Sequence, residues 1–545
     1  MAGVATAEAA GQADKTIVLD ALIVGAGFSG LYQLHKLRGL GLDVRVVEQG
    51  AGVGGTWYWN RYPGARCDSE SHVYWYTFSK ELMHAWSWSE RYPGQAEIMR
   101  YLDFVADKLD LKRDIQFNTR MVGARYDAAA NRWRVQTEQG ETFEAKFLIT
   151  AVGCLSTANV PKFPGLESFK GKWYHTGQWP HEGVDFTGKR VAQIGTGSTG
   201  IQSAPVIAET AAHLTVFQRT ANYSVPARNV PLTDEFKQQV RDTASDIRQT
   251  THETYNGMGF RVSDRKALET APAERQALYE AAWERGGLQF RATFQDMLFS
   301  KEANDTAADF IKGKIRSIVR DQRTAAILSD IDHPYAAKRP PIDTDYFETF
   351  NRPNVSLVDV RAEPIERISE HGIVTSKGEY PVDIIVFATG FDAMTGPLMR
   401  LNITGRDGVA LRDVWEAGPR NYLGLGVAGF PNLFTITGPG SPSVLCNMPV
   451  AIEQHVDWIT DCIAHMRATG KERIEAKPES VERWVAEVNE VASRTLLPQA
   501  THSWYLGANI PGKPRVFMPY AGGLPRYREI CDEVAAKDYE GFALA

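Results

Sequence analysis

The chain has 545 residues, of which 43% are hydrophobic and 23% are charged, and its formal net charge is -6. A chain of this length is too long for one compact core, so we expect a globular protein of two or three domains. The mixed charge gives no basic field for nucleic acid and no polybasic patch for anionic membranes. We therefore expect no nucleic-acid partner and no membrane partner.

Cysteine usage and the N-terminal stretch predict the location of the protein. The five cysteines stand far apart, without a CxxC pair or a regular zinc or disulfide spacing, so we predict a reducing compartment and no metal site. Residues 1–15 are rich in alanine and lack the basic start and apolar run of a signal peptide. No later segment has membrane-spanning length. These patterns indicate a cytoplasmic protein with a disordered leader over residues 1–15, and nothing demands more than a monomer.

The first predicted elements form a strand, a turn and a helix. A buried strand starts at Thr16 and includes Ala21–Val24, and the helix after it carries leucines at three-residue spacing before Gly39 and Gly41. A second strand follows over Val44–Glu48. This order is typical of the βαβ unit that opens a parallel sheet.

The same order of elements recurs further along the chain. It consists of a strand over Arg190–Ile194, a turn over Gly195–Gly200, a helix from Ile201 and a strand over Leu214–Phe217. Pro205 falls within the first two helical turns, where its missing donor does less harm than in mid-helix. We therefore still predict a helix from Ile201, and we expect Pro205 to make it less regular.

The remaining chain contains an insertion and further strands. Between Tyr223 and His333 the sequence is charged and amphipathic with apolar positions at helical spacing, which predicts a helical insertion. Strands resume at Val355–Val358 and Asp383–Ala388. The predicted fold class is α/β, with two Rossmann-like dinucleotide-binding domains and this insertion. The expected first domain comprises 16–150 and 385–545, the second 151–222 and 334–384, and the insertion 223–333.

The first glycine motif has the sequence context of a dinucleotide site. Gly25, Gly27 and Gly30 follow a strand and open a helix, so backbone amides and the helix N-terminus can meet a diphosphate. In isolation such a motif can be a plain tight turn. Glu48 ends the next strand, where a carboxylate accepts hydrogen bonds from a ribose diol and repels a 2'-phosphate. The first site therefore suits FAD or NAD.

The second motif differs from the first at the residue that follows its next strand, the position equivalent to Glu48. There Gln218 replaces the carboxylate and Arg219 follows, so the pocket gains a guanidinium that can clamp a 2'-phosphate. The alternative is that Arg219 is a solvated surface residue. The second site suits NADPH, and two such sites in one chain predict a flavin that a nicotinamide reduces. The expected contacts at this site are Gly195, Gly197, Ser198, Thr199, Gly200, Arg219 and Thr220.

Spacing alone leaves the reaction of the flavin open. A disulfide reductase needs a redox dithiol beside the flavin, and none is encoded. An oxygenase needs room for a flavin peroxide, a group that controls its protonation and a substrate pocket.

One segment between the two glycine motifs resembles a known family signature. Residues 169–180 fit the pattern FxGxxxHxxxWP of the type I Baeyer–Villiger monooxygenases, and further similar stretches extend the resemblance from Ala21 to the C-terminus. Within that family the chain is more similar to the phenylacetone and steroid monooxygenases than to the cyclohexanone enzyme. The matching signature residues are Phe169, Gly171, His175, Trp179 and Pro180.

The resemblance implies a mechanism. NADPH would reduce FAD, oxygen would add at the flavin C4a carbon, and the peroxide would attack a ketone to give an ester or lactone. By the same resemblance Arg339 stabilises the peroxide anion and Asp68 positions that arginine. Lys338 joins Arg219 at the 2'-phosphate, and Trp504 closes over the cofactor. Gly55, Thr56 and Trp57 are expected near FAD, and Ser443, Val444, Leu445 and Met448 are expected in an apolar substrate pocket.

Other interpretations remain at this point. Asp68 could cap a turn, and Lys338 and Arg339 could form an exposed basic pair. His175 and Trp179 are expected to fasten the linker between the nucleotide domains rather than to contact substrate. Alternative functions are a flavin monooxygenase acting on nitrogen or sulfur, and a flavin-binding redox sensor without turnover. The sequence does not fix whether the ketone is aryl, aliphatic, cyclic or steroid.

Overall fold

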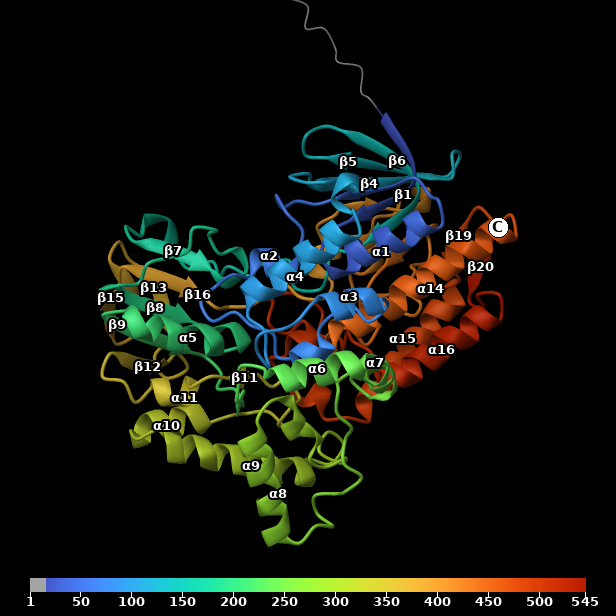
Figure 1. Ribbon diagram of the computed structural model, residues 1–545. Helices are drawn as coiled ribbons and strands as arrows, with labels where there is room; N and C mark the ends of the chain where they lie inside the picture. The colour runs from blue at the N-terminus through green and yellow to red at the C-terminus, as the bar shows by residue number, and fades with distance from the viewer. Residues whose placement is uncertain (1–15) are drawn as a thin grey trace, which may run out of the picture.

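Two sheets with parallel cores organise the chain, and helices pack around both (Figure 1). The computed structural model describes residues 16–545, so the leader predicted for residues 1–15 lies outside the described residues. In Figure 1 one sheet lies at the top centre and the other at the left, with the C-terminal helices on the right. The predicted α/β class with two dinucleotide-binding folds is confirmed.

The first sheet has the strand order β17-β4-β5-β6-β1-β2-β3, with β18 beside β6. β1 runs parallel to β2 and β6, whereas β4, β5 and β6 form an antiparallel meander. Apolar residues with no exposure, such as Ala21 and Ile23, fix β1 in the interior. The strands are β1 (Thr16–Val24), β2 (Val44–Val47), β3 (Ile115–Gln116), β4 (Met121–Asp127), β5 (Arg132–Thr137), β6 (Thr142–Thr150), β17 (Ile403–Thr404) and β18 (Leu433–Thr435).

Helix α1 (Phe28–Gly39) crosses from β1 to β2, as its leucine spacing predicts. Leu31, Leu34 and Leu37 are fully buried, because their three-residue spacing places them near one helix face. Helix α1 also packs on α14 (Met448–Ala468), where Gln33 Nε2 donates to Thr460 Oγ1 at 3.2 Å. The C-terminal part of the chain thus covers the first βαβ unit.

The second sheet is parallel throughout, in the order β12-β9-β8-β16-β7. Helix α5 (Ser198–Thr210) connects β8 to β9 and continues through Pro205, so the predicted helix is confirmed. An antiparallel sheet of β13 (Ile365–Ile368), β14 (Gly372–Thr375) and β15 (Gly378–Pro381) packs beside it. The parallel strands are β7 (Lys172–His175), β8 (Arg190–Ile194), β9 (His213–Gln218), β12 (Val355–Asp359) and β16 (Ile384–Phe387).

The insertion is helical, as predicted, and in Figure 1 its first two helices lie at the centre while the later ones lie at the bottom, below the second sheet. Its two ends are joined by a short parallel pair that the sequence did not predict, β10 (Val225–Pro226) with β11 (Ile342–Asp343). This pairing returns the chain to the point where it left the nucleotide-binding fold. The helices are α6 (Asp234–Asp242), α7 (Ala244–Glu253), α8 (Pro272–Arg285), α9 (Lys301–Ile318) and α10 (Gln322–Ser329).

Shorter elements and the C-terminal helices complete the fold. The last strands, β19 and β20, pair antiparallel and close the C-terminus onto the helices before it. The remaining elements are α2 (Thr56–Trp59), α3 (Lys80–Ala85), α4 (Gln95–Lys108), α11 (Tyr346–Thr349), α12 (Gly396–Met399), α13 (Leu411–Val414), α15 (Pro478–Ser493), α16 (Leu524–Ala536), β19 (Ile474–Ala476) and β20 (Phe542–Leu544).

One expected domain boundary falls inside a strand. β16 pairs with β7 and β8 and runs to Phe387, so a division between residues 384 and 385 would cut it. We propose that the first domain resumes after Phe387, and we retain the other domain limits as proposals.

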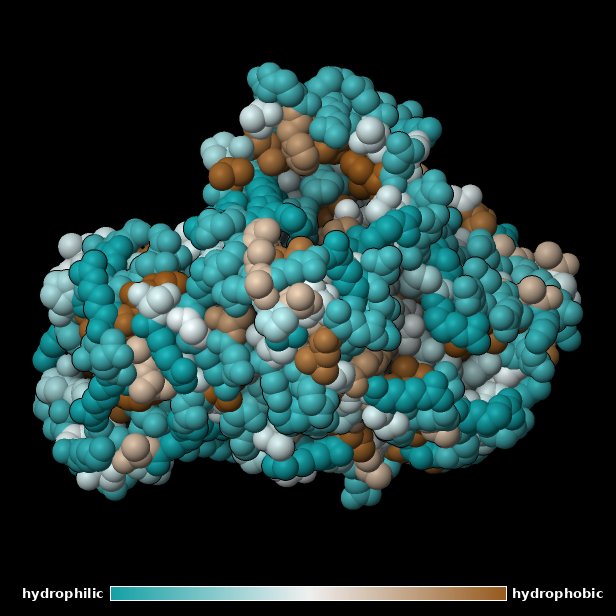
Figure 2. Space-filling model, turned by 90° about the horizontal axis from the view of Figure 1, so that it is seen from below, coloured by the Kyte–Doolittle hydropathy of each residue, from teal (hydrophilic) through white to brown (hydrophobic). Residues whose placement is uncertain are grey.

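The surface is polar on the face seen from below (Figure 2). Hydrophilic side chains dominate this view, and hydrophobic ones form small separate groups. Within residues 16–545, no helix combines the length and the apolar character that crossing a bilayer requires.

Candidate active site

The first glycine turn accepts no side chain at two of its positions. A Cβ at Gly25 would stand 2.6 Å from the carbonyl oxygen of Ala151, and one at Gly30 would stand 1.8 Å from the carbonyl oxygen of Gly25. Gly25 also has a φ of +105°, which favours glycine. Gly27 precedes α1, and no side chain caps the free N–H groups of that helix. An uncapped helix N-terminus on a tight glycine turn fits a diphosphate.

Glu48 lies directly after β2 and reaches back to this turn. Its side chain is buried and accepts hydrogen bonds from Ala26 N at 2.7 Å and from Gly50 N at 2.6 Å. Burial raises the pKa of Glu48, and these backbone N–H groups act in the opposite direction. Each carboxylate oxygen has a second lone pair, so the group can also accept from a ribose hydroxyl.

A second glycine segment packs on the same turn. Gly54 N donates to Ala26 O at 3.0 Å, and a Cβ at Gly55 would lie 3.0 Å from Gly27 Cα. The short helix α2 then begins at an exposed Thr56. Trp57 is buried, and its Nε1 donates to Tyr74 Oη at 3.1 Å. The structure thus brings Gly55 and the start of α2 to the first motif.

The second glycine turn repeats the backbone of the first. Gly195 has a φ of +112°, and its Cβ would stand 2.3 Å from the carbonyl oxygen of Ala388. A Cβ at Gly200 would stand 2.3 Å from the carbonyl oxygen of Gly195. At Gly197, in contrast, a Cβ would have no neighbour within 4 Å, and Ser198 beside it is exposed. The N-terminus of α5 therefore opens to the surface without a capping side chain.

Two cations stand near this second turn. Arg219 is exposed directly after β9, and its charge acts on the half-buried Lys338. Burial lowers the pKa of Lys338, Asp332 raises it, and Arg219 lowers it further. Gln218 points the other way, because it is buried and donates from Nε2 to Ile327 O at 3.1 Å. Two neighbouring cations and no adjacent carboxylate on β9 suit a 2'-phosphate.

Thr199 and Thr220 lie on the rim of the same turn. Thr199 Oγ1 accepts a hydrogen bond from Thr176 Oγ1 at 3.4 Å, which links α5 to the segment after β7. Thr220 O accepts from Thr196 Oγ1 at 2.9 Å, which fixes the segment after β9 to the glycine turn. Both threonines are partly exposed.

Asp68 and Arg339 form a two-point ion pair across a sequence separation of 271 residues. Arg339 Nε donates to Asp68 Oδ2 at 2.6 Å, and Nη2 donates to Oδ1 at 2.8 Å. The exposed fractions of the two side chains are only 18% and 21%. Burial alone would raise the pKa of Asp68, but the Arg339 charge and hydrogen bonds hold it below its ordinary value. Burial acts to lower the pKa of Arg339, yet Asp68 raises it, so both groups stay charged.

A third contact ties this pair to the expected substrate loop. Arg339 Nη1 donates to Val444 O at 2.9 Å. Ser443 is buried with a φ of +41°, and its hydroxyl donates inward to Thr437 O at 3.0 Å. The Ser443 hydroxyl is therefore used in a hydrogen bond inside the protein. Leu445 and Met448 are partly buried and pack with Val444 in one apolar cluster.

Trp504 belongs to the same apolar cluster. It packs against Tyr505, whose ring centroid lies 4.5 Å away. Burial raises the pKa of Tyr505 to about 12, and the nearby Arg339 charge opposes that rise. The structure thus brings together Arg339, the loop at Val444 and the Trp504 segment.

The signature residues lie apart from this centre, along β7 and the segments that join the two sheets. Gly171 is close-packed, since its Cβ would stand 2.4 Å from Asp383 O. His175 is buried, its ring centroid lies 5.9 Å from that of Phe391, and burial lowers its pKa to about 4. Asn159 N donates to Gly390 O at 3.0 Å in the paired connecting segments beside it. These contacts agree with a role in fastening the linkers.

The other signature residues are Trp179, Pro180 and Phe169. Trp179 is buried against Tyr174, at 5.6 Å between ring centroids, and against Phe186. Pro180 follows it and is partly exposed, and Phe169 packs in the cluster under the second sheet.

Sequence reasoning missed Arg291. It lies in the last turn of a 3-10 helix, Leu288–Ala292, inside the insertion, and its charge acts on both Asp68 and Arg339. No sequence motif identifies Arg291, because the insertion shows only the periodicity of amphipathic helices. Among residues 16–545 no cluster of His, Cys, Asp or Glu side chains has a metal-binding arrangement.

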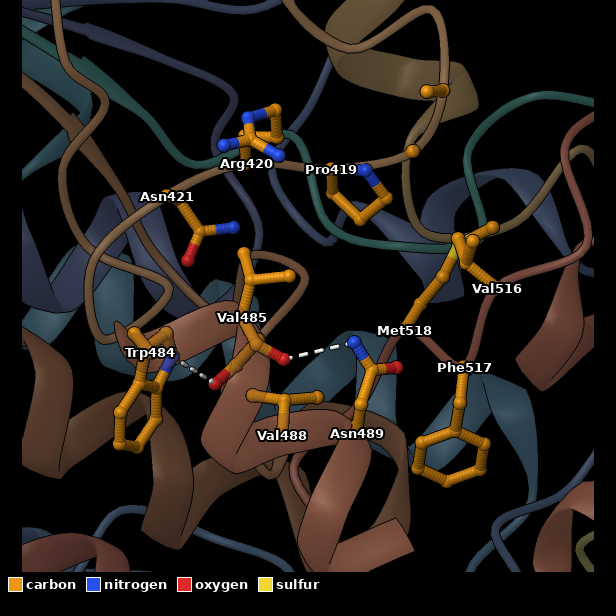
Figure 3. Close-up of a pocket in the computed structure, with 13 residues that line it drawn as sticks. Pro419, Arg420, Asn421, Trp484, Val485, Val488, Asn489, Val516, Phe517 and Met518 are labelled. Carbon is orange, nitrogen blue, oxygen red and sulfur yellow. Dashed lines mark hydrogen bonds between the residues drawn. The ribbon is translucent and has the colours of Figure 1, made fainter. Parts of the chain in front are cut away.

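A cavity of about 80 Å³ adjoins the segment before the substrate loop (Figure 3). Trp484 and Asn489 of α15 lie on one side of it, and Val516 and Met518 lie on the other. Gly440 N donates to Met518 O at 2.6 Å, which ties the two chain segments together. None of the predicted site residues lines this cavity.

Comparisons with known proteins agree on one family. Residues 19–229 match the family described as FMO-like, flavin-binding monooxygenase-like. The chain is 46% identical over 525 residues to a Baeyer–Villiger monooxygenase of Pseudooceanicola batsensis, covering 95% of each chain. It is 43% identical to the methyl acetate-forming acetone monooxygenase of Gordonia sp. strain TY-5, over 97% of this chain and 100% of that protein. A solved structure of oxidised steroid monooxygenase bound to NADP superposes with a TM-score of 0.92 at 52% identity, over 97% of this chain and 99% of that one.

Proposed function

This chain belongs to the Baeyer–Villiger monooxygenases, and we propose that its Asp68–Arg339 pair is the centre at which a ketone is oxidised. Membership confirms the resemblance that residues 169–180 carry. The protein is an FAD-containing, NADPH-dependent enzyme that inserts one oxygen atom beside a ketone carbonyl to give an ester or lactone. The flavin, once reduced by NADPH, supplies the activated oxygen.

Within residues 16–545, the hydrogen bonds of Arg339 leave two of its donors free for the reaction. A guanidinium has five N–H groups, and the contacts to Asp68 and Val444 use three of them. One N–H on Nη1 and one on Nη2 remain. We propose that these two donors stabilise negative charge on oxygen, first on the attacking atom and then on the former carbonyl oxygen.

Asp68 acts as a positioning residue in this scheme. Its two oxygens hold the guanidinium plane in one orientation, and its charge raises the pKa of Arg339 against the effect of burial. A neutral side chain at this position would leave the arginine charged but less well oriented. The two-point pair is the observation that carries the proposal.

The two glycine turns are proposed to hold the two cofactors. The residues at the first turn fit FAD, because Glu48 faces the turn and both Gly55 and α2 pack beside it. The residues at the second turn fit NADPH, because Thr220 beside Arg219 bonds to the glycine turn and the Arg219 charge acts on Lys338. Trp504 is proposed to close over the nicotinamide cofactor and exclude water from the centre.

The substrate pocket is proposed to be apolar. Val444, Leu445 and Met448 share one cluster with Trp504, and the Ser443 hydroxyl is turned into the fold. We further propose that the enzyme is monomeric and cytoplasmic and that it binds neither nucleic acid nor membranes, in keeping with its net charge of -6.

A product assay tests the proposed centre. Purified holoenzyme is given NADPH, air and a panel of aryl, aliphatic, cyclic and steroid ketones, and esters or lactones are identified by mass spectrometry. Sulfides and amines are assayed in parallel. We expect ester or lactone from ketones, whereas NADPH consumption that yields only hydrogen peroxide would oppose the proposal.

The matched variants are Arg339→Ala and Asp68→Asn. Arg339→Ala should still allow NADPH to bleach the flavin anaerobically but should lose ester formation by about 1000-fold or more. Asp68→Asn should lose less, because the charge of Arg339 persists. Retained ester formation in Arg339→Ala would remove Arg339 from this role.

A further inference from the structure

Arg291 is a partly buried cation without an ion-pair partner in the described part of the chain. Its Nη2 atom is inaccessible to solvent and makes no hydrogen bond within residues 16–545. Burying such a charge is costly unless a counter-charge accompanies it. Two formal charges act on Arg291, those of Asp68 and Arg339, and these two neutralise each other. One positive charge is therefore left over beside the catalytic pair.

The neighbours of Arg291 hold it firmly against the Asp68 segment. Gln289 Nε2 donates to Glu70 Oε1 at 3.4 Å, which ties the 3-10 helix to the loop after Asp68. On the other side, the Phe290 ring packs perpendicular to the Tyr335 ring at 5.5 Å. The residues on either side of Arg291 therefore contact the loop after Asp68 and the Tyr335 ring.

Tyr335 supplies a second unpartnered polar atom. The residue is fully buried, and its hydroxyl makes no hydrogen bond within the described residues. Its backbone is fixed by Asn304, which accepts from Tyr335 N at 2.8 Å and donates to Tyr335 O at 2.9 Å. The Nη2 atom of Arg291 and the Tyr335 hydroxyl are thus two enclosed donors without acceptors in the described residues, and the packing of Phe290 on Tyr335 brings their segments together.

The cofactor phosphates do not explain this arrangement. Lys338 and Arg219, which suit the 2'-phosphate, are not among the charges that act most strongly on Arg291. The diphosphates belong at the N-termini of α1 and α5, which Arg291 does not flank. The charge of Arg291 instead lowers the pKa of Tyr505, which follows Trp504, and of Cys446, which follows Leu445 in the proposed substrate loop.

We propose that Arg291, together with the Tyr335 hydroxyl, forms a subsite for a carboxylate on the substrate, so that the enzyme prefers oxo acids to neutral ketones of equal size. This inference rests on the proposed ketone oxygenation and names its substrate class. A guanidinium matches the planar geometry of a carboxylate, and one uncompensated positive charge matches a monoanion.

The test measures kcat/KM for ester formation with matched pairs of substrates. Methyl ketones that carry a terminal carboxylate, from 4-oxopentanoate to 6-oxoheptanoate, are compared with their own methyl esters on the holoenzyme. We expect the wild type to favour the acid of the best-fitting length by about 10-fold or more. Arg291→Leu should lower this acid-to-ester ratio by about 10- to 100-fold, and Arg291→Lys should restore part of it. Arg265→Leu is the control, because Arg265 lies in the same insertion but is exposed and pairs with Glu274.

The outcomes separate this inference from the proposed function. A wild-type ratio near one, with neutral ketones oxidised, would overturn the carboxylate subsite and leave ketone oxygenation standing. An equal loss for acid and ester in Arg291→Leu would also overturn it, because Arg291 would then serve the reaction and not substrate choice. Should Arg291→Leu fail to fold, wild-type inhibition decides: hexanoate should inhibit at about 10-fold lower concentration than hexanamide, and equal inhibition would overturn the proposal.

Discussion

The two glycine turns share one backbone design but differ in the residues that come after the next strand. In each turn the first glycine packs against a carbonyl of the segment leaving the neighbouring strand, Ala151 after β6 and Ala388 after β16. In each turn the third glycine packs against the carbonyl of the first, at Gly25 and at Gly195. This geometry is dictated by close approach and is independent of which nucleotide binds.

The difference lies in the direction of one side chain. Glu48 turns into the first motif and bonds to Ala26 N, whereas Gln218 turns away and bonds to Ile327 O in the insertion. The second motif therefore offers Arg219 and Lys338 where the first offers a carboxylate. The glycines make a site for a diphosphate. The residues after the next strand, β2 or β9, determine whether the site accepts a ribose diol or a 2'-phosphate.

Gly30→Ala should have the largest effect on this comparison. Its Cβ would stand 1.8 Å from the Gly25 carbonyl oxygen, a backbone atom that cannot move aside, so the cost is about 3 kcal/mol or more. We expect the purified protein to lack the flavin absorbance of the wild type. Gly39→Ala is the control, because nothing lies within 4 Å of a Cβ there, and it should retain flavin.

Gly200→Ala makes the matching change in the second turn, where the Cβ would stand 2.3 Å from Gly195 O. This variant should keep its flavin but should lose anaerobic reduction by NADPH by about 100-fold. Stopped-flow bleaching of the flavin measures the rate. Loss of flavin from both variants would show that the two turns do not serve separate cofactors.

Arg219→Ala should sharpen the contrast between the two nucleotides. Removing one of the two cations beside α5 should lower kcat/KM for NADPH by about 30- to 100-fold, because a charge-assisted contact to the 2'-phosphate is lost. The value for NADH, which lacks that phosphate, should change by less than about threefold. Arg367→Ala, at an exposed arginine of β13, is the control. An unchanged preference for NADPH would place the phosphate elsewhere.

Glu48→Gln should have a smaller effect, on the first motif alone. An amide keeps one acceptor but turns an N–H toward either Ala26 N or Gly50 N, so one buried hydrogen bond is lost. We expect FAD to bind about 10-fold more weakly, as measured by flavin titration of the apoprotein. The preference for NADPH over NADH should stay at its wild-type value, and a change in it would contradict the assignment of Glu48 to the first site.

The sequence predicts the glycine turns well because their signal is local. A strand, three glycines and a helix lie within about one βαβ unit, and steric limits on Gly25 and Gly195 act between near neighbours or adjoining strands. The helical insertion was predicted from its periodicity for the same reason. The short pair of β10 with β11, which closes the insertion, has too few residues to show a pattern.

The catalytic pair could not be found from local patterns. Asp68 and Arg339 are 271 residues apart, and each alone reads as an ordinary surface charge, so only the family resemblance brought them together. The direction of Gln218 and the position of Arg291 depend on how the insertion packs, which no spacing rule encodes. The roles given to these site residues stay predictions, and the variants above test them.

The smallest expected effect is a pH dependence at the second motif. Burial, opposed by Asp332 and aided by Arg219, leaves the pKa of Lys338 below its ordinary value. The ammonium is charged below its pKa, so rising alkaline pH should remove its charge and lower kcat/KM for NADPH by about 3- to 10-fold. Lys338→Arg should flatten this profile, because a guanidinium stays protonated throughout. NADH should show no such decline, and a parallel decline for both nucleotides would assign the titration to a group other than Lys338.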